Sequence, residues 1–303
     1  MEKTLETIRI NVDIDNGLKA NNVLSQLSEV LESEKEKEVR INFDGVGFIA
    51  ANQLAVLGAL FDEFCVKKEA HIYLDNLKPN LRQVMQKNGF GQNIGLDPIK
   101  DRFHTTIPYK HFRISESTEF EKYLIMHIFQ RTDIPVMTEA AKNAITDNIL
   151  EVFNNVKEHT SASYVYACGQ FFPKSKKIYF SIVDIGETIK ENVDNYFKDM
   201  GICKKDELRE SNHIQWAMME GNSTRKENSP GGLGFSILSK FIALNKGELS
   251  IVSDDECYEF KSNKYRTRQL AHRFKGTIVT VAINMSDTFS YLAINDSIEQ
   301  IVF

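Results

Sequence analysis

One stretch of the chain, residues 138–160 (TEAAKNAITDNILEVFNNVKEHT), constrains the fold most because it predicts one long helix with two kinds of surface. Its apolar residues recur at three- and four-residue spacing, which is typical of a helix with one buried face. These residues are Ala141, Ala144, Ile145, Ile149, Val152, Phe153 and Val156. Beside them, Glu151, Asn155 and His159 follow at steps of four, so their side chains share one face. The burial of the apolar face does not require this polar row. Polar residues on a helix most often simply face solvent.

The length of 303 residues allows two domains, each with a core of its own. The hydrophobic share of 42% and the charged share of 26% are ordinary for a globular protein. The net charge of -5 argues against a general nucleic-acid surface, which is normally basic. We therefore expect no nucleic acid among the partners.

No apolar run approaches the roughly 20 residues that a membrane-spanning helix needs. The N-terminus also lacks the apolar segment of a signal peptide. The 4 cysteines are scattered without a CxxC pair, which favours free thiols over disulfides or a zinc site. These patterns predict a cytoplasmic protein without membrane contact.

Residues 1–95 alternate short strands with amphipathic helices and predict a small β/α domain. The stretch 39–60 (VRINFDGVGFIAANQLAVLGAL) resembles the STAS domain of bacterial anti-sigma-factor antagonists, in which an apolar strand, a turn and a helix follow one another. Phosphorylated members open this helix with Asp-Ser-Ser-Gly, which contains the phosphoacceptor serine. Here residues 50–53 read AANQ, so the resemblance implies a degenerate STAS-like module without the phosphoswitch. A generic small β/α domain is the alternative.

The second half of the chain begins after a weakly patterned segment, residues 96–116, which we expect to hold the linker and the start of a second domain. Residues 117–286 then mix helical patterns with apolar strands, so the predicted fold class is α+β. The tail, residues 287–303, is apolar and too short to span a membrane reliably. We expect this tail to dock on the chain's own surface, with a homodimer or partner contact as the alternative.

Two motifs in the second half have the form of ligand-binding turns. The sequence GGLG at residues 231–234 opens a predicted helix, where free N–H groups and the helix dipole favour anions. No Gly-Lys-Ser/Thr follows, so this is not a Walker A loop. Asp184 and Gly186 lie at the end of an apolar strand, where a carboxylate can accept a hydrogen bond from an exocyclic amine. Each signal is weak alone.

In combination and in this order, these motifs resemble the GHKL (Bergerat-fold) ATP-binding domain, found in type II topoisomerases, sensor histidine kinases and anti-sigma-factor kinases. The resemblance covers residues 117–286 and implies an α/β sandwich whose mixed sheet is covered by helices, with ATP and Mg²⁺ as ligands. The family's asparagine box matches ILEVFNNVKEHT. This match gives Glu151 the role of general base, Asn155 that of magnesium ligand, and His159 a place near a phosphate.

The remaining boxes of the family fall on residues further along the chain. Asp184 takes the place of the adenine-binding aspartate, with Gly186 in its box, and Thr277 that of a hydroxyl near the adenine. The ATP lid and the second glycine box complete the set of nucleotide-binding residues. They are Ser223, Thr224 and Arg225 in the lid, and Gly231, Gly232, Leu233, Gly234 and Phe235 at the glycine box. Thr188 stands where the family usually has a second glycine, so this loop departs from the pattern.

The resemblance implies an ATP-binding regulatory protein, a Mg-dependent ATPase that acts as a nucleotide-controlled switch for protein partners. A protein-serine kinase of the anti-sigma-factor type is one alternative, although residues 50–53 offer no serine in cis. A binding module that holds ATP without hydrolysing it is the other. A topoisomerase-like clamp is disfavoured, because the acidic chain has no room for the further domains that such a clamp needs.

Overall fold

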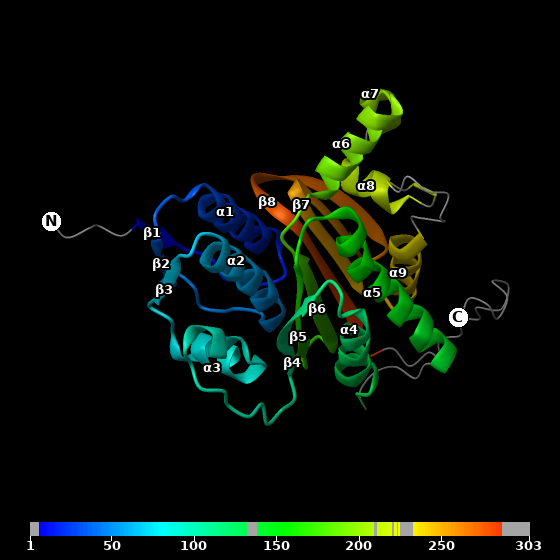
Figure 1. Ribbon diagram of the computed structural model, residues 1–303. Helices are drawn as coiled ribbons and strands as arrows, with labels where there is room; N and C mark the ends of the chain where they lie inside the picture. Colours follow the sequence, from blue (N-terminus) through cyan, green and yellow to red (C-terminus); the bar gives the residue numbers. More distant parts are fainter. Residues whose placement is uncertain are drawn as a thin grey trace.

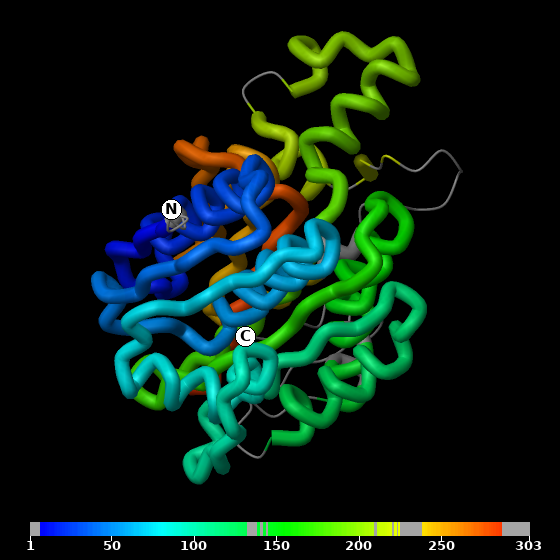
Figure 2. Tube along the Cα trace, turned by 60° about the vertical axis from the view of Figure 1, so that its left-hand side comes forward, coloured from blue at the N-terminus to red at the C-terminus, as the bar shows by residue number. Residues whose placement is uncertain are grey.

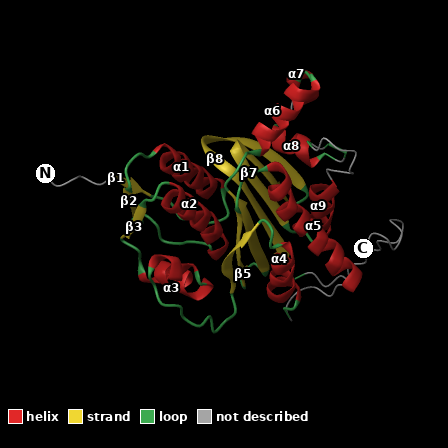
Figure 3. Cartoon of the chain, in the orientation of Figure 1, coloured by secondary structure: helices red, strands yellow, loops and turns green. Residues whose placement is uncertain are grey.

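The computed structural model describes residues 6–131, 138–208, 211–219, 221–222, 224 and 233–286. Within these ranges the fold is α+β, as predicted, with one parallel and one antiparallel sheet (Figure 1; Figure 3). No helix in the described ranges is long and apolar enough to cross a membrane. The tail at residues 287–303 lies outside the described residues, so its docking stays a prediction.

The first sheet is parallel and has the strand order β1-β2-β3. Its strands are β1 (Glu6–Arg9), β2 (Glu38–Asn42) and β3 (His71–Asp75). Parallel strands need crossover connections, which α1 (Leu18–Ser33) and α2 (Leu54–Lys67) supply. Three further pieces complete this half: a 3₁₀ turn before α2 (Ala51–Gln53), α3 (Pro79–Asn88), and a second 3₁₀ turn (Phe90–Ile94).

The second sheet is antiparallel and has the strand order β4-β5-β6-β8-β7. Its strands are β4 (Thr106–Arg113), β5 (Tyr164–Phe172), β6 (Lys177–Asp184), β7 (Glu248–Lys261) and β8 (Lys264–Asn284). The prediction of a mixed sheet is wrong, because every pairing between these strands is antiparallel. Strands β6 and β7 run in the same direction, but β8 returns from β7 through a tight turn and lies between them. The two like-directed strands are therefore never neighbours.

The helices of the second half lie mainly on one face of this sheet (Figure 1). They are α4 (Ser117–Leu124), a π-helical turn (Ile125–Phe129), α5 (Glu139–His159), α6 (Ile189–Met200), α7 (Lys204–Leu208), α8 (His213–Met218) and α9 (Leu233–Leu244). The expected long helix is α5. Its apolar residues pack in one cluster with the sheet and with α4 and α9.

Helices α1 and α2 lie between the two sheets, which gives the molecule the layer order sheet, helix, sheet, helix (Figure 1; Figure 2). Helix α2 touches β3 on one side and β5 and β6 on the other. Residues 54–61 are all buried, as expected of a helix that is apolar on every side. This central layer brings the N-terminal half against the face of the second sheet opposite α5.

One continuous apolar cluster joins the two halves, from the first sheet through α1 and α2 to residues of β5, β6, β7 and β8. The connection at residues 96–105 has no regular structure, and β4 begins directly after it. The boundary predicted from the sequence stays a prediction. The packing shows that the two halves share this cluster, while the second half also holds a cluster of its own between α5 and the sheet.

Candidate functional site

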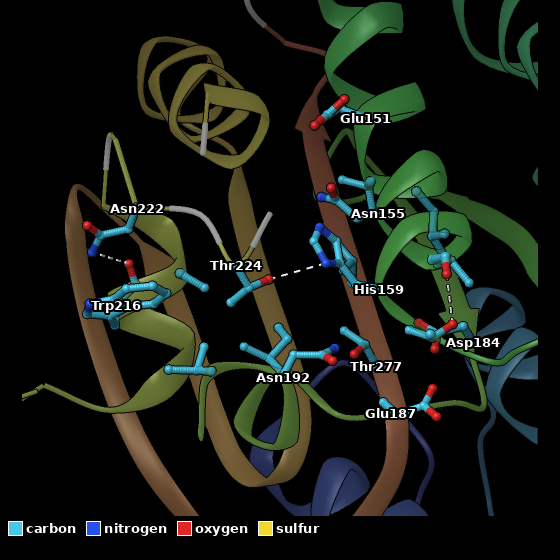
Figure 4. Close-up of a pocket in the computed structure, with 18 residues that line it drawn as sticks. Glu151, Asn155, His159, Asp184, Glu187, Asn192, Trp216, Asn222, Thr224 and Thr277 are labelled. Carbon is cyan, nitrogen blue, oxygen red and sulfur yellow. Dashed lines mark hydrogen bonds between the residues drawn. The ribbon is translucent and has the colours of Figure 1, made fainter. Parts of the chain in front are cut away.

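A pocket of about 900 Å³, counted with its solvent-open space, lies between α5, the strands β6 and β8, and the helices α6 and α8 (Figure 4). Residues far apart in the sequence meet on its walls. Those that the sequence singled out are Glu151, Asn155, His159, Asp184, Thr224 and Thr277.

The row on α5 forms one wall of the pocket. The apolar stripe of α5 is buried against the sheet, which turns the neighbouring face of the helix toward the pocket. Figure 4 shows Glu151, Asn155 and His159 one after another along this face. The structure thus places a carboxylate, an amide and an imidazole along one edge of a cavity.

Asp184, the last residue of β6, is the most unusual group in the pocket. Its side chain is only 4% exposed, and its Oδ1 has no hydrogen-bond partner among the described residues. Burial, with a smaller contribution from the nearby charge of Glu187, raises the pKa of this carboxyl to about 8. A buried acceptor without a partner is costly, so Asp184 is suited to receive an N–H donor from a ligand.

Thr277 pairs with Asp184 across the β6–β8 ladder and lines the same pocket. Its Oγ1 lies 3.1 Å from Ser253 Oγ, which donates its own proton to the carbonyl of Gly276 at 2.8 Å. Ser253 must then accept from Thr277, so Thr277 keeps lone pairs for a donor in the pocket. The base of the pocket thereby offers two acceptors, Asp184 and Thr277.

Gly276 allows β8 to approach Asp184 closely. Its φ is +110°, and a Cβ at this position would lie 2.1 Å from the carbonyl oxygen of Asp184. Gly186 has a different neighbour, because a Cβ there would lie 2.7 Å from Cβ of Thr160 at the end of α5. Gly186 therefore lets the β6 end pack against α5, and it is not among the residues that line the pocket.

Thr188, the departure from the family pattern, has a clear local role. Its hydroxyl accepts a hydrogen bond from Glu191 N–H, and the Glu191 carboxylate accepts from the Thr188 N–H, which together form a capping box at the start of α6. The cap fixes where α6 begins and so positions Asn192, which lines the pocket.

The predicted lid and glycine box are described only in part. Ser223, Arg225, Gly231 and Gly232 lie outside the described residues. Thr224 lines the pocket, and its Oγ1 is 3.2 Å from Nδ1 of His159. The other residues of the glycine box, Leu233, Gly234 and Phe235, form the first turn of α9, which packs against α5.

Sequence reasoning missed the wall formed by α6 and α8. Asn192, Trp216 and Asn222 line it, and Asn222 donates to the carbonyl of Trp216 at 2.9 Å. Trp216 also packs edge-on against Phe197, with ring centroids 5.0 Å apart. The sequence TIKE at residues 188–191 has the form of a capping box, and this signal could have predicted the start of α6.

His213 holds α8 in place behind the wall. Its Nδ1 is 2.6 Å from Glu256 of β7, and its Nε2 is 3.0 Å from Asp194 of α6. Glu256 also accepts a hydrogen bond from the N–H of Ile214 in the first turn of α8. One buried imidazole therefore ties α8 to both α6 and the sheet.

The pocket offers oxygen ligands of the kind that Mg²⁺ prefers, on Glu151 and Asn155. No group of three or more His, Cys, Asp or Glu side chains in the described ranges could hold a metal. Mg²⁺ typically takes one or two protein oxygens and completes its shell with phosphates and water. The amide oxygen of Asn155 beside the carboxylate of Glu151 suits such a partial set.

The chain was also compared with known proteins. No protein-family model matches it, and no curated protein is significantly similar to it.

Proposed function

We propose that this chain is an ATP-binding regulatory protein, a Mg-dependent ATPase whose nucleotide state controls its contacts with protein partners. The observation that carries the proposal is Asp184, a buried carboxyl that lines the pocket and has one oxygen without a partner among the described residues. The exocyclic amine of adenine supplies the N–H donor that this oxygen lacks. Thr277 beside it offers a second acceptor.

Asn155 would hold Mg²⁺ through its amide oxygen, and His159 lies one turn further along α5, toward Thr224. The metal, when bound, would neutralise phosphate charge. The first turn of α9, which follows the glycine-rich segment, would favour an anion through its free N–H groups. These residues support a triphosphate that extends from the base of the pocket along α5.

Glu151 would orient the attacking water and accept its proton. It lies one helical turn from Asn155 on the same wall, so a base and a metal ligand are adjacent. Phosphoryl transfer asks little of a protein beyond positioning and charge neutralisation. The residues on this wall would thus support a slow hydrolytic switch.

The kinase alternative requires a serine from another protein. Residues 50–53, which correspond to the phosphoacceptor region of the STAS family, carry no hydroxyl and are buried beneath β5 and β6. Ala51 N–H donates to Gln170 Oε1, and Asn52 Nδ2 donates to Ser181 Oγ at 2.9 Å. This region faces the side of the sheet opposite the pocket, so it is not a substrate in cis.

A phosphate-release assay tests the proposal. We expect purified protein with Mg-ATP to release phosphate slowly, and Glu151→Gln to lower the rate by about 100-fold, the scale of a general base. Glu158→Gln, an exposed carboxylate on the same helix, is the matched control and should keep the wild-type rate. Nucleotide that binds but stays intact would support the non-hydrolysing module, and absence of ATP binding would contradict the proposal as a whole.

A further inference from the structure

The β7–β8 hairpin curls into an arch on the opposite side of the sheet from the nucleotide pocket. The strand register shifts around Asp254, whose φ is +55°, and such bulges bend a strand. The bend brings Lys261, at the far end of β7, within 3.1 Å of Glu248 at its start. Helix α1 packs against β8 beside this arch (Figure 1).

A second cavity, of about 1260 Å³ with its solvent-open space, lies between the arch, the start of α1 and β6. It shares no residue with the nucleotide pocket: Thr280 of β8 lines this cavity, whereas Thr277 and Val279 line the other. The two cavities are therefore separate sites on opposite faces of the same strand.

The carboxylates that line this cavity are paired with cations, but two of its cations are not paired with any described residue. Glu248 is paired with Lys177 at 2.6 Å and with Lys261, and Glu259 is near Arg268 at 3.5 Å. Lys264 and Arg266, which also line the cavity, have no ion pair within the described part of the chain. Two cations that line the cavity thus remain available for an anion.

The start of α1 adds to this preference for an anion. Asn16 and Gly17 line the cavity, and the first turn of the helix has no side-chain cap and no acidic residue, although Asp15 Oδ1 accepts from the N–H of Gly17 at 2.8 Å. The first N–H groups of a helix have no partner within it, and the helix dipole favours negative charge at this end. A phosphate is the group that such ends bind most readily.

Gln53 points independently to a ligand with hydrogen-bond donors. It lines the cavity and is 1% exposed, and its Nε2 donates to the carbonyl of Asp15 at 2.9 Å and to Asn16 Oδ1 at 3.1 Å. Its Oε1 is buried and has no partner among the described residues. A hydroxyl group would satisfy this acceptor.

We propose that the cavity under the β7–β8 arch is a second binding site, which takes a small phosphate ester bearing hydroxyl groups. Lys264, Arg266 and the first turn of α1 bind the phosphate. A hydroxyl of the ligand donates to Gln53 Oε1. The site is built by both halves of the chain, so its ligand also ties α1 to the second sheet.

Calorimetric titration of the full chain with two matched probes tests this site. Glycerol 3-phosphate carries the hydroxyls that propyl phosphate lacks, so we expect it to bind about tenfold more tightly. The double substitution Lys264→Gln with Arg266→Gln should weaken both probes by about tenfold or more. Arg102→Gln, which changes an exposed cation elsewhere, is the control and should leave both affinities unchanged.

Gln53→Met tests the hydroxyl-binding part of the site independently of the phosphate-binding part. It should reduce the affinity for glycerol 3-phosphate to that for propyl phosphate and leave propyl phosphate unchanged. Because a buried substitution can impair folding, circular dichroism is recorded first, and the surface double variant carries the test if Gln53→Met is unfolded. Absence of binding for both probes up to about 10 mM, or equal binding by the double variant and the wild type, would overturn the site.

Discussion

Asp184 has an environment that changes its chemistry, and this change predicts a pH dependence of stability. The pKa of Asp184 is raised from 3.8 to about 8 by burial. Between these values the folded chain keeps a proton that the unfolded chain has released. This group therefore makes the free energy of unfolding fall as the pH rises from about 4 to about 8, and its effect levels off above that.

Asp184→Asn removes this titration. Urea unfolding at about pH 5 and about pH 8.5 should show the wild type losing stability relative to the variant as the pH rises. Asp147→Asn, which alters an exposed carboxylate on α5, should show no such trend. An equal difference in the free energy of unfolding between wild type and Asp184→Asn at both pH values would show that the pKa of Asp184 is not raised in the folded chain.

Gly276 gives a second prediction for a single residue. Gly276→Ala places a Cβ 2.1 Å from the Asp184 carbonyl at a positive φ, so we expect a loss of about 3 kcal/mol or more in the free energy of unfolding. Gly95 also has a positive φ, but a Cβ there would meet nothing within 4 Å. Gly95→Ala should therefore cost only about 1 kcal/mol. Equal losses in urea unfolding would mean that the close contact at Gly276 does not matter.

Among the elements, α5 was the most predictable, and α6 and α8 the least. The polar row of α5 follows from side-chain spacing within one helix, which a sequence displays directly. The opposite wall depends on how short helices fold back onto the sheet, and Trp216 gave no periodic signal. The antiparallel order of the second sheet likewise depends on where β8 inserts, which local patterns do not encode.

His213 links these short helices, so its removal should loosen one wall of the pocket. His213→Gln takes an imidazole from between Glu256 and Asp194, and a buried acceptor such as Glu256 Oε1 that loses its partner costs about 1–3 kcal/mol. We expect this loss in urea unfolding, together with a red shift of Trp216 fluorescence as α8 moves away. His71→Gln, at an exposed histidine, is the control. Unchanged stability and emission would contradict the role of His213 as an anchor.

For the whole molecule, the shared core is the main finding that the sequence did not predict. Alternating strands and helices in residues 1–95 indicated a small β/α unit, and such a unit is present. The same patterns do not predict that a second sheet packs on the other side of α2. The apolar run at residues 54–61 is consistent with burial of α2 on both sides. Residues 50–53 are buried because the second sheet packs against them as well.

The contact between α2 and the second sheet can be tested at Gly58. A Cβ there would lie 2.2 Å from Oη and 2.5 Å from Cε2 of Tyr109 in β4, so Gly58→Ala should destabilise the chain by about 1–3 kcal/mol. In the background of Tyr109→Leu the same substitution should cost much less. A double-mutant cycle by urea unfolding measures this coupling, and additive effects would contradict the contact.

A shared core also predicts that the two halves unfold together. Differential scanning calorimetry of the full chain should show one cooperative transition, because α1 and α2 cannot leave the second sheet without exposing its buried face. Two separate transitions would indicate that each half has a sufficient core of its own.

The central claim, that the pocket beside α5 binds an adenine nucleotide, is tested most directly by titration with a non-hydrolysable ATP analogue and Mg²⁺. Trp216, the single tryptophan of the chain, lines the pocket and reports binding by fluorescence. We predict a saturable signal that Asp184→Asn and Asn155→Ala each weaken by about tenfold or more, while Asp147→Asn and Asn143→Ala leave it unchanged. Equal affinity in Asp184→Asn and the wild type, or no binding by the wild type, would contradict the account.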